Sequence, residues 1–193
     1  MLTEEQGKRL IQLAKESIIS SLLHDSIDVE SYQDEFPDAH GVFVTLKKKG
    51  ELRGCIGFPL PDYPLFEGVF KAARAAAFDD PRFPPLAKDE LSDIDIEISV
   101  LSVPVTVKFK DPDDLLKKIK VGRDGLMIKY NFASGLLLPQ VPVELGWDEK
   151  TFLDNLCLKA GLPKGSWKEK DVEIKSFQAQ VFYQDKEDEY ANL

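Results

Sequence analysis

Val42-Phe-Val-Thr-Leu-Lys-Lys-Lys-Gly-Glu-Leu-Arg-Gly-Cys-Ile-Gly-Phe58 is the stretch that decides the fold. It holds two short apolar runs, 42–46 and 52–58, on either side of a basic turn segment. This pattern is typical of a β-hairpin, and hairpins build antiparallel sheets. We expect a three-residue loop over 48–50, with Gly50 in the left-handed conformation. The strands would then pair Lys47 with Glu51, Leu46 with Leu52, Val44 with Gly54 and Val42 with Ile56.

In this register one face of the hairpin is apolar throughout, and a slip of one residue would mix the two faces. The other face carries Phe43, Thr45, Arg53 and Cys55. The lysines at 47–49 are the densest basic run, and we interpret them as a solvated turn.

One helix is expected before the hairpin in the sequence and another after it. A helix over 3–24 begins with a capping box formed by Thr3 and Gln6 and carries apolar residues at every fourth position. A second helix over 64–78 is rich in alanine, which lets a helix lie close to a sheet, and Pro81 prevents its continuation. The remaining expectations are a loop over 25–40, strands over 94–100, 103–109 and 172–183, helices over 112–119 and 149–160, a hairpin of 125–130 with 135–141, and an acidic tail over 184–193.

Helices combined with strands that are mostly joined as hairpins predict an α+β fold with largely antiparallel sheet. With 193 residues, 43% of them hydrophobic, the chain can bury a core as one domain over 1–193 or as two small lobes. The net charge of −9 argues against binding to nucleic acid, which depends on a basic face. No apolar run approaches the roughly 20 residues of a membrane helix, and no signal peptide is visible, so we expect a cytoplasmic protein.

Cys55 is the first candidate for chemistry. It lies between Gly54 and Gly57 and two residues from Arg53, so in a regular strand Arg53 and Cys55 would share a face about 6.5–7 Å apart. A nearby cation favours the thiolate, which is the nucleophilic form of cysteine. Alternatively, Arg53 receives a substrate carboxylate or phosphate, or Cys55 is a small apolar filler beside a surface arginine. Neither histidine is placed as an obvious base for the thiol.

Three other groups contain side chains capable of chemistry. Asp80 and Arg82 follow the alanine-rich helix and either form a cap and ion pair or line a site. Glu97 shares a strand face with Asp93 and Asp95, which suits either acid–base work or a solvated face. Cys157 lies on an apolar helical stripe and is expected in the core. No metal or cofactor motif is present, so we expect neither metal nor cofactor.

The hexapeptide Leu52-Arg-Gly-Cys-Ile-Gly57 resembles the signature of the AMMECR family, as do further blocks in the same order. These blocks are Asp80-Pro-Arg-Phe-Pro-Pro-Leu86, Ile96-Glu-Ile-Ser-Val-Leu-Ser102, Asp124-Gly-Leu126, Leu138-Pro-Gln-Val-Pro-Val-Glu144, Trp147 and Leu156-Cys-Leu-Lys-Ala-Gly-Leu162. The resemblance covers nearly the whole chain and implies an archaeal or bacterial member with two unequal lobes. It implies these site-lining residues: Arg53, Cys55, Asp80, Arg82, Glu97, Gln140 and Glu144.

The resemblance also implies a pathway shared with a Memo-like protein and a radical-SAM enzyme. Two functions follow as hypotheses. In the first, the protein is an enzyme or enzyme subunit that uses Cys55 as a thiolate nucleophile or redox group, with Arg53 or Arg82 holding an anionic substrate. In the second, it is a non-catalytic module that binds a small ligand or a partner's peptide, where Gly54 and Gly57 permit close approach and Cys55 is incidental.

Overall fold

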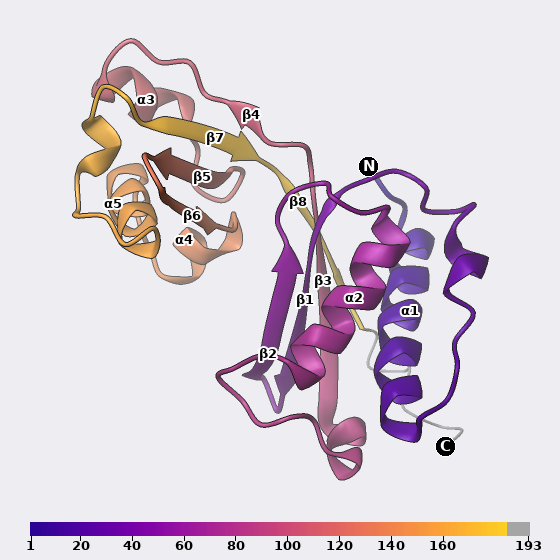
Figure 1. Ribbon diagram of the computed structural model, residues 1–193. Helices are drawn as coiled ribbons and strands as arrows, with labels where there is room; N and C mark the ends of the chain where they lie inside the picture. Colours follow the sequence, from indigo (N-terminus) through magenta and orange to yellow (C-terminus); the bar gives the residue numbers. More distant parts are fainter. Residues whose placement is uncertain (185–193) are drawn as a thin grey trace. The chain divides into compact units, whose positions relative to one another are not determined.

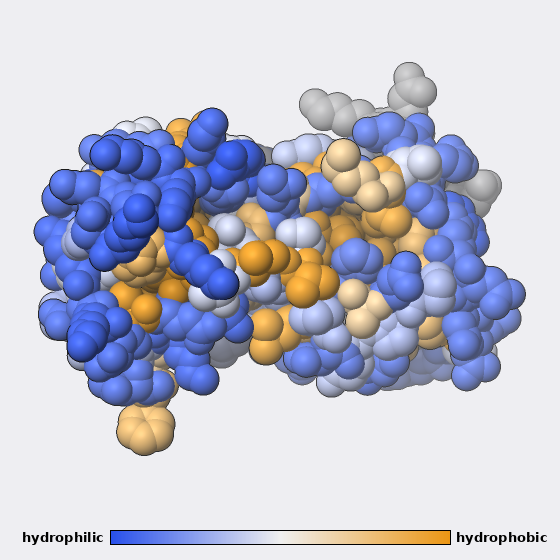
Figure 2. Space-filling view, turned by 90° about the horizontal axis from the view of Figure 1, so that it is seen from above, coloured by the Kyte–Doolittle hydropathy of each residue, from blue (hydrophilic) through white to orange (hydrophobic). Residues whose placement is uncertain are grey.

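The structure is a computed structural model that describes residues 1–184 (Figure 1). The described chain divides into two compact units, one formed by Met1–Leu101 with residues 180–184 and the other by Ser102–Ala179. Hydrophilic residues cover most of the face seen in Figure 2, in keeping with the high charge content. Among residues 1–184, every helix is too short or too polar to span a bilayer. Of the expected acidic tail, residues 185–193 lie outside the described part of the chain.

The first unit packs two helices on one face of a four-stranded sheet, whose strand order is β2-β1-β3-β8. The pairings of β1 with β2 and with β3 are antiparallel. The elements are α1 (Glu4–Leu23), η1 (Val29–Tyr32), β1 (Gly41–Lys48), β2 (Glu51–Phe58), α2 (Leu65–Phe78), η2 (Lys88–Asp93), β3 (Ile94–Leu101) and β8 (Ala179–Tyr183).

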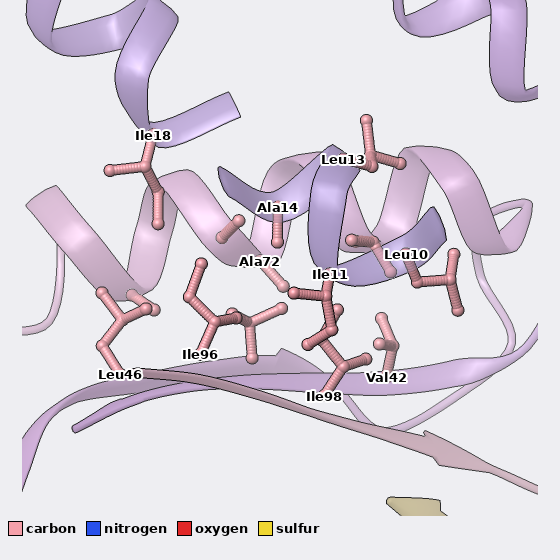
Figure 3. Close-up of a cluster of buried hydrophobic side chains, with 14 of the residues drawn as sticks. Leu10, Ile11, Leu13, Ala14, Ile18, Val42, Leu46, Ala72, Ile96 and Ile98 are labelled. Atoms are coloured by element: carbon pink, nitrogen blue, oxygen red, sulfur yellow. The ribbon is translucent and has the colours of Figure 1, made fainter. Parts of the chain in front are cut away.

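The core of the first unit lies between the two helices and the sheet (Figure 3). Leu10 and Ile18 of α1 and Val42 of β1 are almost completely buried there. The predicted capping box is present, because the Thr3 side chain accepts from the Gln6 N–H while the Gln6 side chain accepts from the Thr3 N–H. The predicted loop 25–40 contains η1, which the sequence pattern did not indicate.

The second unit is a smaller α+β body with the strand order β4-β7-β5-β6. Its strand pairs are antiparallel, and its core gathers around Phe152 and Trp167. Its elements are β4 (Val105–Thr106), α3 (Pro112–Lys118), β5 (Gly125–Tyr130), β6 (Ala133–Leu137), α4 (Gln140–Glu144), α5 (Glu149–Lys159), η3 (Ser166–Lys168) and β7 (Glu173–Phe177). Both units combine helices with antiparallel sheet, so the predicted α+β class is confirmed.

Three predicted strands were wrong in extent. The strand expected over 103–109 is only β4, which covers Val105–Thr106. The single strand expected over 172–183 is two strands, β7 and β8, that belong to different sheets and are separated at Gln178. The strand expected over 135–141 is β6, which begins at Ala133 because the turn occupies only Asn131 and Phe132. It ends at Leu137, and the last two residues of the predicted strand begin α4 instead. Asn131 adopts a positive φ of 53°, which allows this two-residue turn in place of the expected four-residue loop.

The first hairpin forms as predicted, but its register differs by one residue next to the turn and by two residues beyond a bulge. Lys49 and Gly50 both have positive φ, 54° and 85°, so the turn has two residues instead of three. Lys48 therefore pairs with Glu51, and a bulge leaves Arg53 without a partner on β1. Beyond the bulge Val44 lies opposite Ile56, not Gly54. Beyond the bulge, a shift of two residues keeps the side chains on their predicted faces but changes their neighbours across the strands. Next to the turn the shift is one residue, so Leu52 lies opposite Lys47 instead of Leu46 and leaves the apolar face.

Candidate functional site

Cys55 lies in a row of polar side chains that crosses three strands of the first sheet. Thr45 of β1 is directly opposite Cys55 of β2, and Glu97 of β3 is opposite Thr45 on its other side. The hydroxyl of Thr45 donates a hydrogen bond to Cys55 Sγ over 3.3 Å. Cys55 is half-buried. The predicted register would have placed Thr45 opposite Arg53, and this pairing was therefore missed.

Glu97 is held in the row by an ion pair. Lys47 Nζ lies 2.8 Å from Glu97 Oε2, and the carboxylate belongs to a residue that is only 9% exposed. A buried carboxylate requires such a partner because its desolvation is costly. Asp93 and Asp95, which the alternation grouped with Glu97, are exposed. Among the described residues no cluster of three or more histidine, cysteine or acidic side chains could hold a metal ion.

The two glycines beside Cys55 are explained by contacts within the chain. A Cβ on Gly54 would overlap the carbonyl oxygen of Ala76, where α2 crosses β2 closely. A Cβ on Gly57 would overlap the ring of Phe43 and the carbonyl oxygen of Val42. Both positions therefore need glycine for packing. The role of Gly54 and Gly57 in letting a ligand approach stays a prediction. Because packing within the chain already requires glycine at both positions, the two glycines are no longer evidence for a ligand.

Asp80 and Arg82 hold the main chain of Cys55 from the outer side of β2. The Cys55 N–H donates to Asp80 Oδ2 over 2.9 Å, and Arg82 Nη2 donates to the Cys55 carbonyl oxygen over 3.2 Å. Arg82 also binds the Asp80 carboxylate through Nε and Nη2, at 2.9 and 2.7 Å. The Asp80 side chain is 2% exposed, whereas that of Arg82 is 53% exposed. These two predicted site residues are thus brought together with Cys55.

Hydrogen bonding sets the charge states of this pair. The side-chain hydrogen bonds from Arg82 hold the pKa of Asp80 well below its usual range, although burial opposes the effect. The N–H groups of Cys55 and Arg82 lower the pKa of Asp80 further. The hydrogen bonds to Asp80 raise the pKa of Arg82, and an electrostatic interaction with Cys55 adds to the increase. Arg82 is therefore a permanent cation beside Cys55.

Arg53 is engaged elsewhere. Its Nε and Nη2 atoms bind the two carboxylate oxygens of Glu90 at 3.0 and 2.8 Å, and its guanidinium lies over the ring of Phe83. Lys48 Nζ also binds Glu90, at 2.9 Å. Hydrogen bonding from Arg53 lowers the pKa of Glu90 to about 2. The sequence did not indicate Glu90, because its partner Arg53 is 37 residues away along the chain. Arg53 also lies on the bulge of β2, which the sequence pattern did not predict.

Arg53 therefore does not take the predicted place beside the thiol. Within residues 1–184 it forms no hydrogen bond with Cys55, and its planar fork is occupied by Glu90. Its Nη1 atom is buried and has no hydrogen-bond partner in the described residues. Of the two arginines that the sequence suggested, Arg82 is the one that contacts Cys55.

Gln140 and Glu144 belong to the second unit, where they begin and end α4. Gln140 is half-buried, and its Oε1 atom is buried without a hydrogen-bond partner in the described residues. Glu144 is exposed. The other predicted site residues all lie in the first unit.

Cys157 is completely buried in the core of the second unit, as predicted. Burial raises the pKa of its thiol. Its lack of exposure and this shift both oppose formation of a thiolate. The two cysteines thus differ sharply in accessibility, which allows them to be studied separately.

Comparison with known proteins identifies relatives along nearly the whole chain. A family model described as AMMECR1 matches residues 11–182. Protein MJ0810 of Methanocaldococcus jannaschii is 47% identical over 184 residues, which cover 94% of this chain and 92% of the relative. Protein TK0174 of Thermococcus kodakarensis is also 47% identical, over 98% of this chain and 93% of the relative.

A solved structure agrees with the fold. The crystal structure of the uncharacterized protein PH0010 from Pyrococcus horikoshii matches with a TM-score of 0.89 at 43% identity, covering 95% of this chain and 94% of that one. Archaeal relatives of this similarity fit the expectation of an archaeal member. The matched family model and the extent of these relatives show that the chain belongs to the AMMECR1 family.

Proposed function

We propose that this protein is an enzyme or enzyme subunit that uses the thiol of Cys55 as a nucleophile or redox group. The observation that carries the proposal is the pair of contacts on Cys55: the Thr45 hydroxyl on its sulfur and the Arg82 guanidinium on its carbonyl oxygen. Hydrogen-bond donors and cations stabilise the negative charge of a thiolate relative to the neutral thiol. Partial exposure gives a reactant access to the sulfur.

Arg82 supports the second part of the proposal, that the substrate carries an anionic group. The guanidinium uses Nε and Nη2 on Asp80 and Cys55, and its Nη1 forms no hydrogen bond with residues 1–184. Because the side chain is 53% exposed, Nη1 can donate to a carboxylate or phosphate of a molecule at the thiol. Arg53 is less suited to this role, because its Nε and Nη2 bind Glu90 and its remaining Nη1 is buried.

We propose further that the protein works with a Memo-like protein and a radical-SAM enzyme, as the family resemblance implies. Titration calorimetry between this chain and a purified archaeal Memo-like protein tests the first partnership. Heat that saturates at a defined stoichiometry supports it, and absence of heat at high micromolar concentration counts against it.

The test of the thiol site is the rate of alkylation of Cys55 by iodoacetamide as a function of pH. In this reaction the thiolate sulfur forms a bond to the reagent carbon and iodide leaves. Peptide mass spectrometry separates Cys55 from the buried Cys157, so the unmodified sequence is used. Arg82→Gln removes the cation, and Arg123→Gln is the matched control, because Arg123 pairs with Asp124 at similar exposure in the second unit.

The pKa of a free thiol is about 8.5. Arg82→Gln should move the pH at which the rate reaches half its maximum upward, and Arg123→Gln should leave this midpoint unchanged. If Cys55 is inert, or titrates as a free thiol in all three proteins, the thiol site is refuted. The protein would then be pursued as a non-catalytic binding module, a function that predicts unchanged partner binding after Cys55→Ala.

A further inference from the structure

We infer that Thr45 is a positioning residue for the Cys55 thiol. The inference rests on the proposed function and adds a residue that the family signature does not include. Three observations carry it: the cross-strand pairing of Thr45 with Cys55, the 3.3 Å hydrogen bond from its hydroxyl to Sγ, and the neighbouring Lys47–Glu97 ion pair.

The position of Thr45 is fixed by the sheet. Strand β1 is paired on both sides, with β2 and with β3, so its main chain is held along its full length. Threonine is branched at Cβ, and this restricts rotation about χ1. The hydroxyl is therefore presented to the sulfur from a rigid element, which is the arrangement that a precise chemical site requires.

The direction of the hydroxyl hydrogen is controlled by what surrounds Thr45. A hydroxyl has one hydrogen to donate, and the carboxylate of Glu97, its neighbour on β3, would be the stronger acceptor. Lys47 binds that carboxylate at 2.8 Å and neutralises its charge. No hydrogen bond links Thr45 to Glu97 in the described residues, so the hydroxyl hydrogen is directed to Cys55 Sγ.

This hydrogen bond favours the reactive form of the cysteine. A donor bound to a charged acceptor contributes more than one bound to a neutral acceptor, so the Thr45 hydroxyl stabilises the thiolate over the thiol. When the thiol loses its proton to a base in the buffer, the electron pair of the S–H bond stays on sulfur and attacks the electrophile. The charged groups facing the row are Lys47 and Glu97 from the neighbouring strands and Asp80 and Arg82 from the segment after α2.

The test uses Thr45→Val, which keeps the shape of the side chain and removes the hydroxyl, and Thr45→Ser, which keeps the hydroxyl. Ser99→Ala is the control, because Ser99 lies on the same face of the sheet, opposite Phe43. The measurement is the pH profile of Cys55 alkylation by iodoacetamide. We expect Thr45→Val to move the midpoint upward by about one pH unit, a roughly tenfold loss of rate below the midpoint. Thr45→Ser should restore most of the loss, and Ser99→Ala should not move the midpoint.

The outcomes separate this inference from the proposed function. A low midpoint in the unmodified protein that Thr45→Val leaves in place overturns the role of Thr45 and leaves the thiol site standing. A midpoint equal to that of a free thiol in the unmodified protein overturns both. A loss in Thr45→Val that Thr45→Ser does not restore also overturns the inference, because a packing defect would then be the cause. Urea unfolding of each variant, followed by circular dichroism, identifies such a defect directly.

Discussion

Gly54→Ala tests how closely α2 and β2 are packed. The single added methyl group would overlap the carbonyl oxygen of Ala76 and lie 3.1 Å from the carbonyl carbon. Both atoms belong to the helix main chain, so no side-chain rotation can make room. Either the last turns of α2 or the strand must move by about 1 Å to reach ordinary contact distances.

The expected cost follows from this geometry. Adding a methylene-sized group to a close-packed interior costs about 1–3 kcal/mol. The cost of Gly54→Ala should lie near the upper end, about 3 kcal/mol, because the obstructing atom is main chain and Gly54 is buried. Introducing Ala76→Gly as a second change should give no rescue, since the carbonyl group remains in place.

The assay is urea unfolding followed by far-ultraviolet circular dichroism, which reports the long helices of the first unit. Gly68→Ala is the control, because Gly68 lies on α2, the helix that Gly54 contacts from β2. A Cβ there would meet only side-chain atoms, the nearest being a Val42 methyl carbon at 3.0 Å, and the gain in helix propensity of about 1 kcal/mol offsets the crowding. A loss below about 0.5 kcal/mol for Gly54→Ala, or a full rescue by Ala76→Gly, would refute the reasoning.

Two further substitutions test single interactions. The pKa of Glu90 is lowered from 4.5 to about 2, so its stabilising contribution is present above about pH 4.5 and is lost as the pH falls toward 2. In Glu90→Gln, the free energy of unfolding should lose less between pH 5 and pH 2 than in the unmodified protein, by on the order of 3 kcal/mol. Urea midpoints that fall equally in both proteins over this pH range would contradict the prediction. Asp154→Ala should cost about 1–3 kcal/mol, because the buried Trp167 Nε1–H, now 2.8 Å from Asp154 Oδ1, would lose its partner. Tryptophan fluorescence during unfolding measures this cost, and an unchanged midpoint would argue that water replaces the carboxylate.

Much of the fold could be predicted because it depends on local patterns. The capping box of α1, the alternation in β3 and the alanine-rich face of α2 each specify an element from neighbouring residues. The errors in strand register arose at the first hairpin, where one residue more or less in the turn shifts the pairing of the two strands. Lys49 takes a positive φ, which is uncommon for lysine, and so the turn is one residue shorter than expected.

The site was predictable only in part for the same reason. Asp80, Arg82 and Cys55, which the family resemblance grouped, lie together in the structure, while the pattern of the residues alone left open whether Asp80 and Arg82 form only a cap and ion pair. The bulge turned Arg53 toward Glu90 and brought Thr45 opposite Cys55. No residue at this bulge marks its position in the sequence. The Arg53–Glu90 and Thr45–Cys55 contacts could therefore not be predicted without the strand pairing.

The contacts of Asp80 and Arg82 with Cys55 have a consequence for self-association. An outermost strand offers its unpaired N–H and C=O groups to any other extended chain, and such pairing is a route to aggregation. Here a carboxylate and a guanidinium occupy the outward N–H and C=O of Cys55, as the main chain of a fifth strand would. The two side chains that bind the main chain of Cys55 therefore also close the edge of the sheet at that point, so replacing either of them would expose main-chain groups that another extended chain could pair with.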